Sequence, residues 1–131
     1  MAGPTEVTFR SDAFNTRETK EHFLNPHNFG DDVCEWMVSE CVRQGLLPDA
    51  VAPEQEDFGW YFEFWAGSKR HYFVVGYQPE PTGPGRWVGW LERASLLPSL
   101  FGARRFVDPR ARVLVDRVLL SHPRIKDITW S

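Results

Sequence analysis

The clearest pattern along the chain is a strict alternation of side-chain types between residues 58 and 65. The large rings that occupy every second position are Phe58, Trp60, Phe62 and Phe64. Period two in a segment this rich in aromatic residues is typical of a β-strand. Gly67 and Ser68 follow, and a type II′ hairpin turn takes glycine as the first of its two loop residues. The pattern predicts a hairpin in which residues 70–78 return as the partner strand.

That turn also predicts the register of the two strands. The expected cross-strand pairs on the apolar side are Phe58 with Tyr77, Trp60 with Val75 and Phe62 with Phe73. On the other side, Tyr61 should lie opposite Val74, and Glu63 opposite Tyr72. Burying a large apolar side chain stabilises a protein by about 1.5–3 kcal/mol, so the ring-rich side should face the core. A one-residue slip would turn the whole set outward.

Shorter patterns predict the remaining elements. They are an opening strand at residues 7–9, a helix from 31 or 32 to about 44, a third meander strand at 86–93, a helix from 109 to about 122, and a last strand at 125–130. Asp31 or Asp32 can cap the first helix, which Gly45 ends. Asp108 caps the second helix and Pro109 opens it. On the third strand, Val88 and Trp90 are expected on the core side, which leaves Trp87, Gly89 and Leu91 outside.

The element order is β-α-β-β-β-α-β. We expect an α+β fold, a two-layer sandwich in which two helices cover one face of a mainly antiparallel sheet. The order is close to the ferredoxin-like plan, with one added strand. The 131 residues are about one domain in length, so we treat residues 1–131 as a single domain.

Composition and charge narrow the classes of partner. The net charge is −3, which argues against nucleic acid, because nucleic-acid binding normally needs a dense basic face. No apolar run approaches the roughly 20 residues of a membrane span. The start of the chain lacks the apolar region of a secretory signal. Cys34 and Cys41 lie about 10 Å apart on one predicted helix, too far for a disulfide within it. We therefore expect a cytoplasmic protein.

The usual signatures of chemistry do not occur. The four histidines, His22, His27, His71 and His122, lack the spacing of metal ligands, so neither a metal nor another cofactor is expected. A weaker alternative is that His22 and His27 meet the acidic residues 54–57 in space. There is no nucleophile elbow, and Gly83-Pro84-Gly85 leads into a strand and not into a helix, unlike a phosphate-binding loop. These observations lean away from an enzyme.

Two surfaces are candidates for binding. The first is the outer sheet face, whose expected binding residues are Tyr61, Glu63, Trp65, Tyr72, Trp87 and Leu91. If the third strand places Gly89 beside Gly76, then Gly59, Gly76 and Gly89 form a line across three strands. Glycines in strands often mark the close approach of a ligand or another backbone. The alternative is that neighbouring rings or a terminal segment cover them.

The second candidate surface is the segment 96–106. Its expected binding residues are Leu97, Leu100, Phe101, Arg104 and Arg105. Apolar residues bordered by arginine are typical of protein interfaces. The alternative is a helical turn that closes one end of the core.

The chain has more aromatic residues than its core is expected to need, and it lacks a recognisable set of catalytic residues. These two observations favour the function of a non-enzymatic binding or accessory domain. It would engage another protein, or a second copy of itself, through the outer sheet face or the segment 96–106. An inhibitor or immunity-type role in a bacterium would suit such a domain. The alternative hypothesis is a small-molecule-binding protein, or an enzyme, with a pocket near Tyr61, Glu63 and Trp87.

Overall fold

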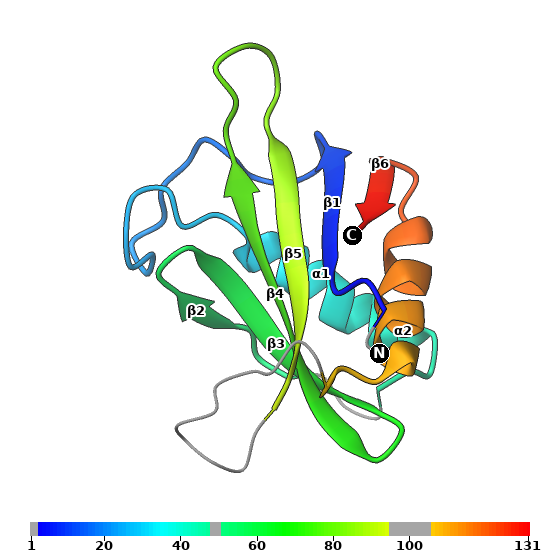
Figure 1. Cartoon of the computed structure of the whole chain (residues 1–131). Coiled ribbons are helices and arrows are strands. Elements are labelled where there is room, and N and C mark those ends of the chain that lie inside the picture. The colour runs from blue at the N-terminus through cyan, green and yellow to red at the C-terminus, as the bar shows by residue number, and fades with distance from the viewer. Residues whose placement is uncertain (1–2, 48–50, 95–105) are drawn as a thin grey trace.

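The computed structural model describes residues 3–47, 51–94 and 106–131, which form one sheet and two helices (Figure 1). The elements are β1 (Glu6–Ser11), α1 (Asp31–Arg43), β2 (Glu54–Glu56), β3 (Gly59–Ala66), β4 (Lys69–Gln78), β5 (Arg86–Arg93), α2 (Pro109–Leu120) and β6 (Ile125–Trp130). All strand pairs are antiparallel, in the order β2-β3-β4-β5-β1-β6. Both helices contact β3. The α+β class is therefore confirmed.

The sheet order departs from the expected ferredoxin-like plan, which is not confirmed. The strands β2 to β5 form a meander, in which each strand pairs with the next one along the chain. The first strand, β1, is inserted between β5 and β6. The short strand β2 was not predicted from the sequence. The order of elements along a chain leaves the choice of neighbours in the sheet open, and here long-range pairing decided it.

The hairpin of β3 and β4 has the predicted register. Trp60 lies opposite Val75, and Phe62 lies opposite Phe73. Gly67 has a φ of 63°, whereas Ser68 has an ordinary negative φ, which is the pattern of a type II′ turn. The core-facing rings of β3 are buried, with Trp60 only 7% exposed. The inward direction of this strand is confirmed.

Phe58 does not join those rings, so its expected place in the core was wrong. Its side chain is 52% exposed. Glu56 pairs with Gly59, so Asp57 and Phe58 form the turn of a second hairpin between β2 and β3. The alternation of a strand does not extend into a turn. The Phe58 ring lies on the outer face, 4.9 Å from the ring of Trp90 between centroids.

The faces of β5 are the reverse of those expected. Leu91 pairs with Phe73 and Trp87 with Tyr77, and residues directly opposite each other share a face. Trp87 and Leu91 are fully buried in the core and are not surface residues. Both sides of β5 carry large apolar side chains, so alternation alone did not distinguish them. The register across the loop 79–85 decided the face.

The glycine line across three strands does not form. Gly89 pairs with Val75 and faces the core, where an added Cβ would lie 2.5 Å from the Phe73 ring. Gly59 and Gly76 do adjoin each other in β3 and β4. A Cβ on Gly76 would lie 2.3 Å from the main-chain oxygen of Phe58. These two glycines therefore allow the neighbouring backbone to approach closely, which a side chain would prevent.

The helices complete the inner layer. In α2, the Asp108 carboxylate accepts a hydrogen bond from the Arg110 N–H at 2.9 Å, as expected for its cap. The predicted aspartate cap of α1 was wrong, because the N-cap is Gly30 and the aspartates occupy the first turn. In the first turn, the negative charges of the aspartates interact favourably with the positive end of the helix dipole. In the described segments, no helix has the length and apolarity to cross a membrane.

Candidate functional site

The candidate site is the outer face of the sheet, which is turned toward the viewer in Figure 1 while α1 lies behind the strands. Alternation along β3 and β4 brings four of the predicted residues to this face: Tyr61, Glu63, Trp65 and Tyr72. Two side chains that sequence reasoning placed in the core, Phe58 and Trp90, also lie here. The sequence analysis did not predict the turn before β3. Predicting that turn would have placed Phe58 outside the core.

Of the outer-face aromatic side chains Phe58, Tyr61, Trp65, Tyr72 and Trp90, four lie in two contacting pairs. Phe58 packs against Trp90, and Tyr61 meets Tyr72 edge to face at a centroid distance of 5.5 Å. Trp65 is 54% exposed. Edge-to-face and tilted contacts are the favoured arrangements of aromatic rings. The four paired rings therefore hold one another in place.

Polar groups hold the hydroxyl and indole ends of these rings. The Tyr61 hydroxyl donates to Glu54 Oε2 at 2.5 Å, and Trp90 Nε1 donates to Glu92 Oε1 at 2.9 Å. Burial raises the pKa of Tyr61 well above its ordinary value, and the bond to Glu54 raises it further. The Tyr61 hydroxyl is consequently a neutral hydrogen-bond donor at physiological pH.

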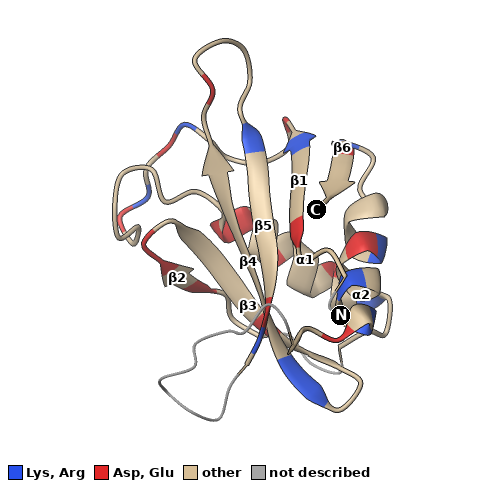
Figure 2. Cartoon of the chain, viewed as in Figure 1, with Lys and Arg blue, Asp and Glu red and all other residues tan. Residues whose placement is uncertain are grey.

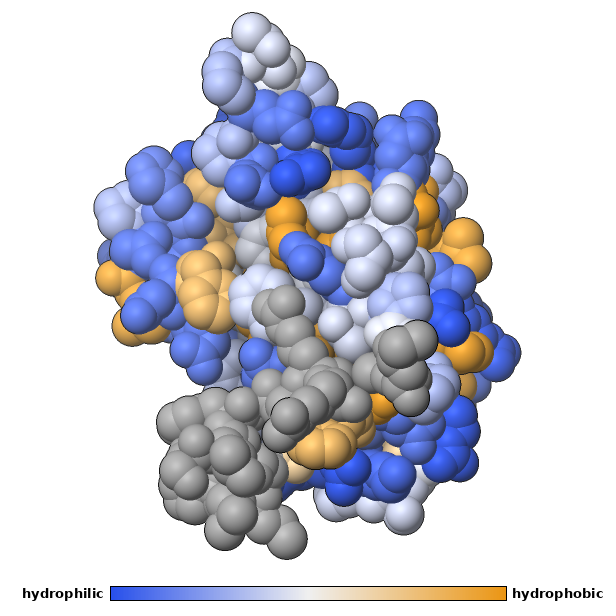
Figure 3. All heavy atoms as spheres, in the orientation of Figure 1, coloured by the Kyte–Doolittle hydropathy of each residue, from blue (hydrophilic) through white to orange (hydrophobic). Residues whose placement is uncertain are grey.

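A groove of about 450 Å³ crosses the outer face. Its lining residues are Glu6, Phe58, Gly76, Tyr77, Gln78, Arg86, Val88 and Trp90. Gly76 has no side chain, so the bottom of the groove between Phe58 and Val88 is formed by backbone. In Figure 3, hydrophobic side chains lie in separate groups among hydrophilic ones on the part of this face that is coloured. The groove is open and amphipathic.

A smaller cavity lies beside Tyr61 and Glu63, where the alternative hypothesis placed a pocket. It measures about 180 Å³ and is lined by Val51, Ala52, Glu54, Tyr61, Phe62 and Glu63. Small-molecule sites usually measure about 300–1,000 Å³. Trp87, the third residue of the expected pocket, lies on the opposite face of the sheet. The structure does not bring these three residues together.

The second candidate surface lies outside the described residues. Its residues Leu97, Leu100, Phe101, Arg104 and Arg105 all fall between the described ranges 51–94 and 106–131. Phe106, at the end of the segment, is described and is 55% exposed.

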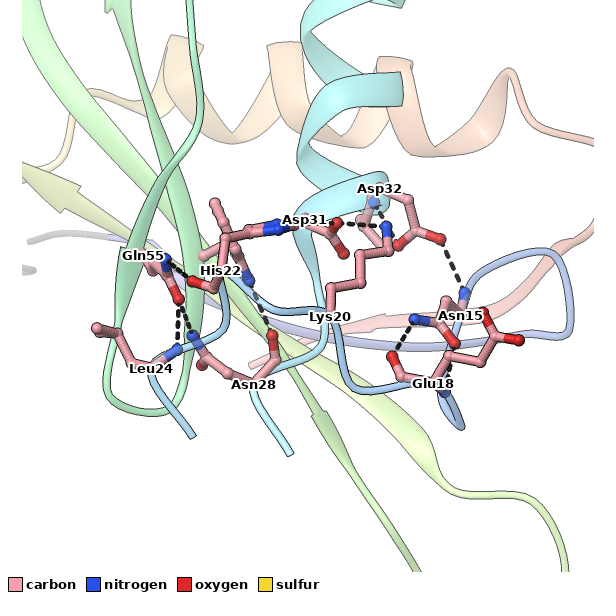
Figure 4. Close-up of polar contacts among 11 residues, drawn as sticks. Asn15, Glu18, Lys20, His22, Leu24, Asn28, Asp31, Asp32 and Gln55 are labelled. Atoms are coloured by element: carbon pink, nitrogen blue, oxygen red, sulfur yellow. Dashed lines mark hydrogen bonds and ion pairs between the residues drawn. The ribbon is translucent and has the colours of Figure 1, made fainter. Parts of the chain in front are cut away.

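A polar cluster at the start of α1 was not anticipated (Figure 4). Asp31 is 3% exposed, and its Oδ2 receives Lys20 Nζ at 2.6 Å. His22 Nε2 lies 3.7 Å from the same oxygen, and among the described residues no ion pair joins His22 or His27 to the acids of residues 54–57. The Asn15 N–H donates to Asp32 at 2.8 Å, while burial raises the pKa of Asp32. These contacts fasten the loop 12–29 to α1.

Gln55 in β2 fastens the same loop to the sheet. Its Oε1 accepts from the Leu24 N–H at 2.8 Å and from Asn28 Nδ2 at 3.0 Å, and its Nε2 donates to the His22 carbonyl. These hydrogen bonds of Gln55 explain why a strand as short as β2 forms. The polar contacts of the loop 12–29, at Asp31 and at Gln55, therefore have a structural role.

Three further reactive side chains, His71, Cys34 and Cys41, are buried. His71 is buried, and its Nε2 accepts a hydrogen bond from the Asp108 N–H at 3.1 Å. Burial raises the pKa of the Cys41 thiol to about 12, and raises that of Cys34 far above its ordinary range. A thiol with such a pKa stays protonated and is a poor nucleophile. Among the residues described, no three His, Cys, Asp or Glu side chains group as metal ligands.

The arrangement defines a class of protein by architecture: a two-layer α+β domain with one face of its sheet buried by helices and an aromatic, amphipathic outer face. Comparisons with known proteins add nothing to this description. No protein-family model, no curated protein and no solved structure matches the chain.

Proposed function

We propose that this protein is a non-enzymatic binding domain that engages another protein through the outer face of its sheet. The supporting observation is the exposure of Phe58 and Trp65, each more than half open to solvent on that face. Aromatic residues are enriched in protein interfaces, where they bury large areas. The proposal includes a cytoplasmic location, supported by the two unpaired cysteines.

The edges of the sheet favour binding by the face over binding by strand addition. The edge strand β2 is three residues long and carries Glu54 and Glu56. At the other edge, the pairing of β6 shifts register, and Asp127 has a left-handed φ of 55°. Short charged strands and bulges are the usual protection against pairing with another chain. A partner is therefore expected to contact side chains on the face.

The small-molecule alternative has less support. The cavity beside Tyr61 and Glu63 is small, and the Glu63 side chain is 41% exposed with Arg70 at 3.8 Å. A carboxylate that is open to solvent and paired with a cation lacks the environment of a buried catalytic acid. The segment 96–106 stays a predicted second surface.

Site-specific photo-crosslinking in the native cell tests the proposal. Benzoylphenylalanine at position 65 should form a defined crosslinked adduct, whereas the same probe at Val113 should not. Val113 is a matched control because it is 58% exposed on α2. The captured protein, once purified, should bind the full chain at least about tenfold more weakly after Phe58→Ala with Trp65→Ala. Equal adducts from both positions would contradict the proposal.

A further inference from the structure

A further cavity lies where β1 ends and β6 begins, and we call it the strand-end cavity. It measures about 320 Å³, whereas small-molecule sites usually measure about 300–1,000 Å³. Its lining residues are Arg10, Ser11, Asp12, Pro84, Gly85, Pro123, Arg124, Lys126 and Asp127. It shares no lining residue with the groove of the outer face. Figure 2 shows basic residues at this end of β1, beside the loop 79–85.

Two cations lie opposite each other at the strand-end cavity. Arg10 in β1 is the direct partner of Lys126 in β6, and like charges in that position destabilise a sheet. The Arg10 guanidinium donates to Glu80 Oε1 at 3.2 Å and to two carbonyl oxygens of the loop 79–85. Within the described segments, no carboxylate lies within ion-pair distance of Lys126. The ammonium of Lys126 is therefore available to a ligand in the cavity.

A backbone irregularity brings the neighbouring residue, Asp127, to the same cavity. Successive side chains of a strand point to opposite faces, yet Lys126 and Asp127 both line this cavity. Asp127 has a left-handed φ of 55°, and the pairing of β1 with β6 shifts register beside it. Bulges of this kind redirect a side chain, and aspartate is one of the few residues that adopt the left-handed conformation singly. The bulge therefore places an ammonium and a carboxylate from adjacent residues around one cavity.

The two charges stay separate, while the other carboxylate of the lining is engaged. Among the residues described, no ion pair joins Lys126 to Asp127. Asp12 Oδ1 accepts a hydrogen bond from Arg124 Nε at 2.9 Å. This bond and the charge of Arg124 lower the pKa of Asp12, which is consequently ionised and paired at neutral pH. Lys126 and Asp127 are therefore the charges of opposite sign that the cavity offers to a ligand.

We propose that the strand-end cavity binds a free α-amino acid, whose carboxylate pairs with Lys126 and whose ammonium pairs with Asp127. Hydrogen bonds between ionised groups are the strong ones, and a zwitterion makes them with both residues. The ligand carboxylate also offsets the repulsion between Lys126 and Arg10. The rings of Pro84 and Pro123 on the lining offer apolar surface to the ligand side chain. This inference goes beyond the proposed function and does not depend on it.

The test is NMR titration of the isotope-labelled full chain with leucine and two derivatives of leucine. N-acetylleucine lacks the ammonium, leucinamide lacks the carboxylate, and both keep the side chain. Leucine should cause saturable shifts of the amide signals of Lys126 and Asp127. It should bind at least about tenfold more tightly than either derivative, because each derivative loses one charge-assisted contact.

Variants of the two charged residues test the assignment of each contact. Asp127→Asn removes the charge and keeps a residue that tolerates the left-handed conformation. Asp127→Asn and Lys126→Gln should each weaken leucine binding at least about tenfold. The matched control is Arg117→Gln, which removes one charge from the exposed side of α2 and should leave the affinity within about twofold. Unchanged melting temperatures establish that the three variants fold.

Several outcomes would overturn this inference. Equal affinities for leucine and N-acetylleucine would show a site for anions only, and equal affinities for leucine and leucinamide would show a site for cations only. The absence of saturable shifts with leucine up to about 10 mM would show that the cavity does not bind amino acids. An equal loss in all three variants would show that the contacts lie elsewhere. The crosslinking at position 65 judges the proposed function separately.

Discussion

The two faces of this sheet come from the same strands and use aromatic residues in opposite ways. On the inner face, Phe62, Phe64 and Phe73 are at most 1% exposed under the helices. On the outer face, Phe58 and Trp65 are 52% and 54% exposed. The inner rings exclude water from the core, whereas the outer rings leave part of their surface open to solvent. A high aromatic content therefore serves stability on one face and a candidate interface on the other.

The faces also differ in how polar groups are treated. The inner face carries His71, whose buried ring is bonded to the Lys69 carbonyl and the Asp108 N–H. On the outer face, carboxylates bond the hydroxyl of Tyr61 and the indole of Trp90 and stay partly in solvent. Changes on the inner face should therefore affect folding, and changes on the outer face should affect binding.

The largest difference is expected between two tryptophans. Trp87→Ala removes a fully buried ring and should lower the free energy of unfolding by about 3–5 kcal/mol. Trp65→Ala removes an exposed ring of the same kind and should change it by less than about 0.5 kcal/mol. Urea denaturation measures both. Similar losses in the free energy of unfolding for the two variants would contradict the assignment of Trp87 to the core and Trp65 to the surface.

The next largest effect on the free energy of unfolding is expected from Gly76→Ala. In Gly76→Ala the new Cβ would lie 2.3 Å from the Phe58 main-chain oxygen, so the strands must separate. We expect a loss of about 1–3 kcal/mol in the free energy of unfolding. The control is Gly3→Ala, where the nearest atom would be 4.0 Å away. A neutral Gly76→Ala would mean that the hairpin approach is looser than described.

A smaller effect is expected from acid through His71. Burial and the nearby Arg93 lower the pKa of His71 in the folded protein below 6.5, its ordinary value. Below pH 6.5 the unfolded chain then binds a proton that the folded chain does not. Stability should be complete above that pH and fall as pH decreases toward the folded pKa, by at most about 1.4 kcal/mol per pH unit.

Chemical denaturation between pH 7 and pH 5 measures this slope. His71→Gln removes the titrating group and should flatten the slope even if the variant is less stable at every pH. His27→Gln alters an exposed histidine and should leave the slope unchanged. Identical slopes for wild type and His71→Gln would show that the histidine is not responsible.

The smallest effect on stability is expected at Glu54. Glu54→Gln removes the carboxylate beside the Tyr61 hydroxyl, so the pKa of Tyr61 should fall part of the way toward its ordinary value of 10.0. The free energy of unfolding should change by less than about 0.5 kcal/mol, because the site is exposed. NMR titration of the tyrosine ring signals measures the shift. Glu92→Gln, which alters the bond to Trp90, should leave Tyr61 unaffected.

Local signals predicted some elements well. The alternation in β3 with Gly67 at the turn was sufficient for the β3–β4 register, because a two-residue loop leaves one pairing. Asp108 and Pro109 were sufficient for the start of α2, because capping depends on neighbours in sequence. The four outer-face residues Tyr61, Glu63, Trp65 and Tyr72 followed from that one register.

Other features depended on contacts between distant residues. The strand β2 forms because Gln55 bonds to the loop 12–29, and nothing in three residues of its sequence indicates a strand. The N-cap of α1 is Gly30 and not the expected aspartate. Glycine suits this position because its φ is positive and because an added Cβ would lie 3.0 Å from the Val75 carbonyl oxygen. The membership of Phe58 in the candidate site depends on the turn that β2 creates.

The core side of β3 was readable from the amino acids alone, because only one of its faces is continuously apolar. The side of β5 that enters the core was settled by tertiary structure, because both of its faces are apolar and the longer loop 79–85 permits either. That choice buried Trp87 and Leu91 and placed Trp90 outside. It also brought Trp90 to Phe58 and Glu6, and thereby built the groove from three segments that are distant in sequence.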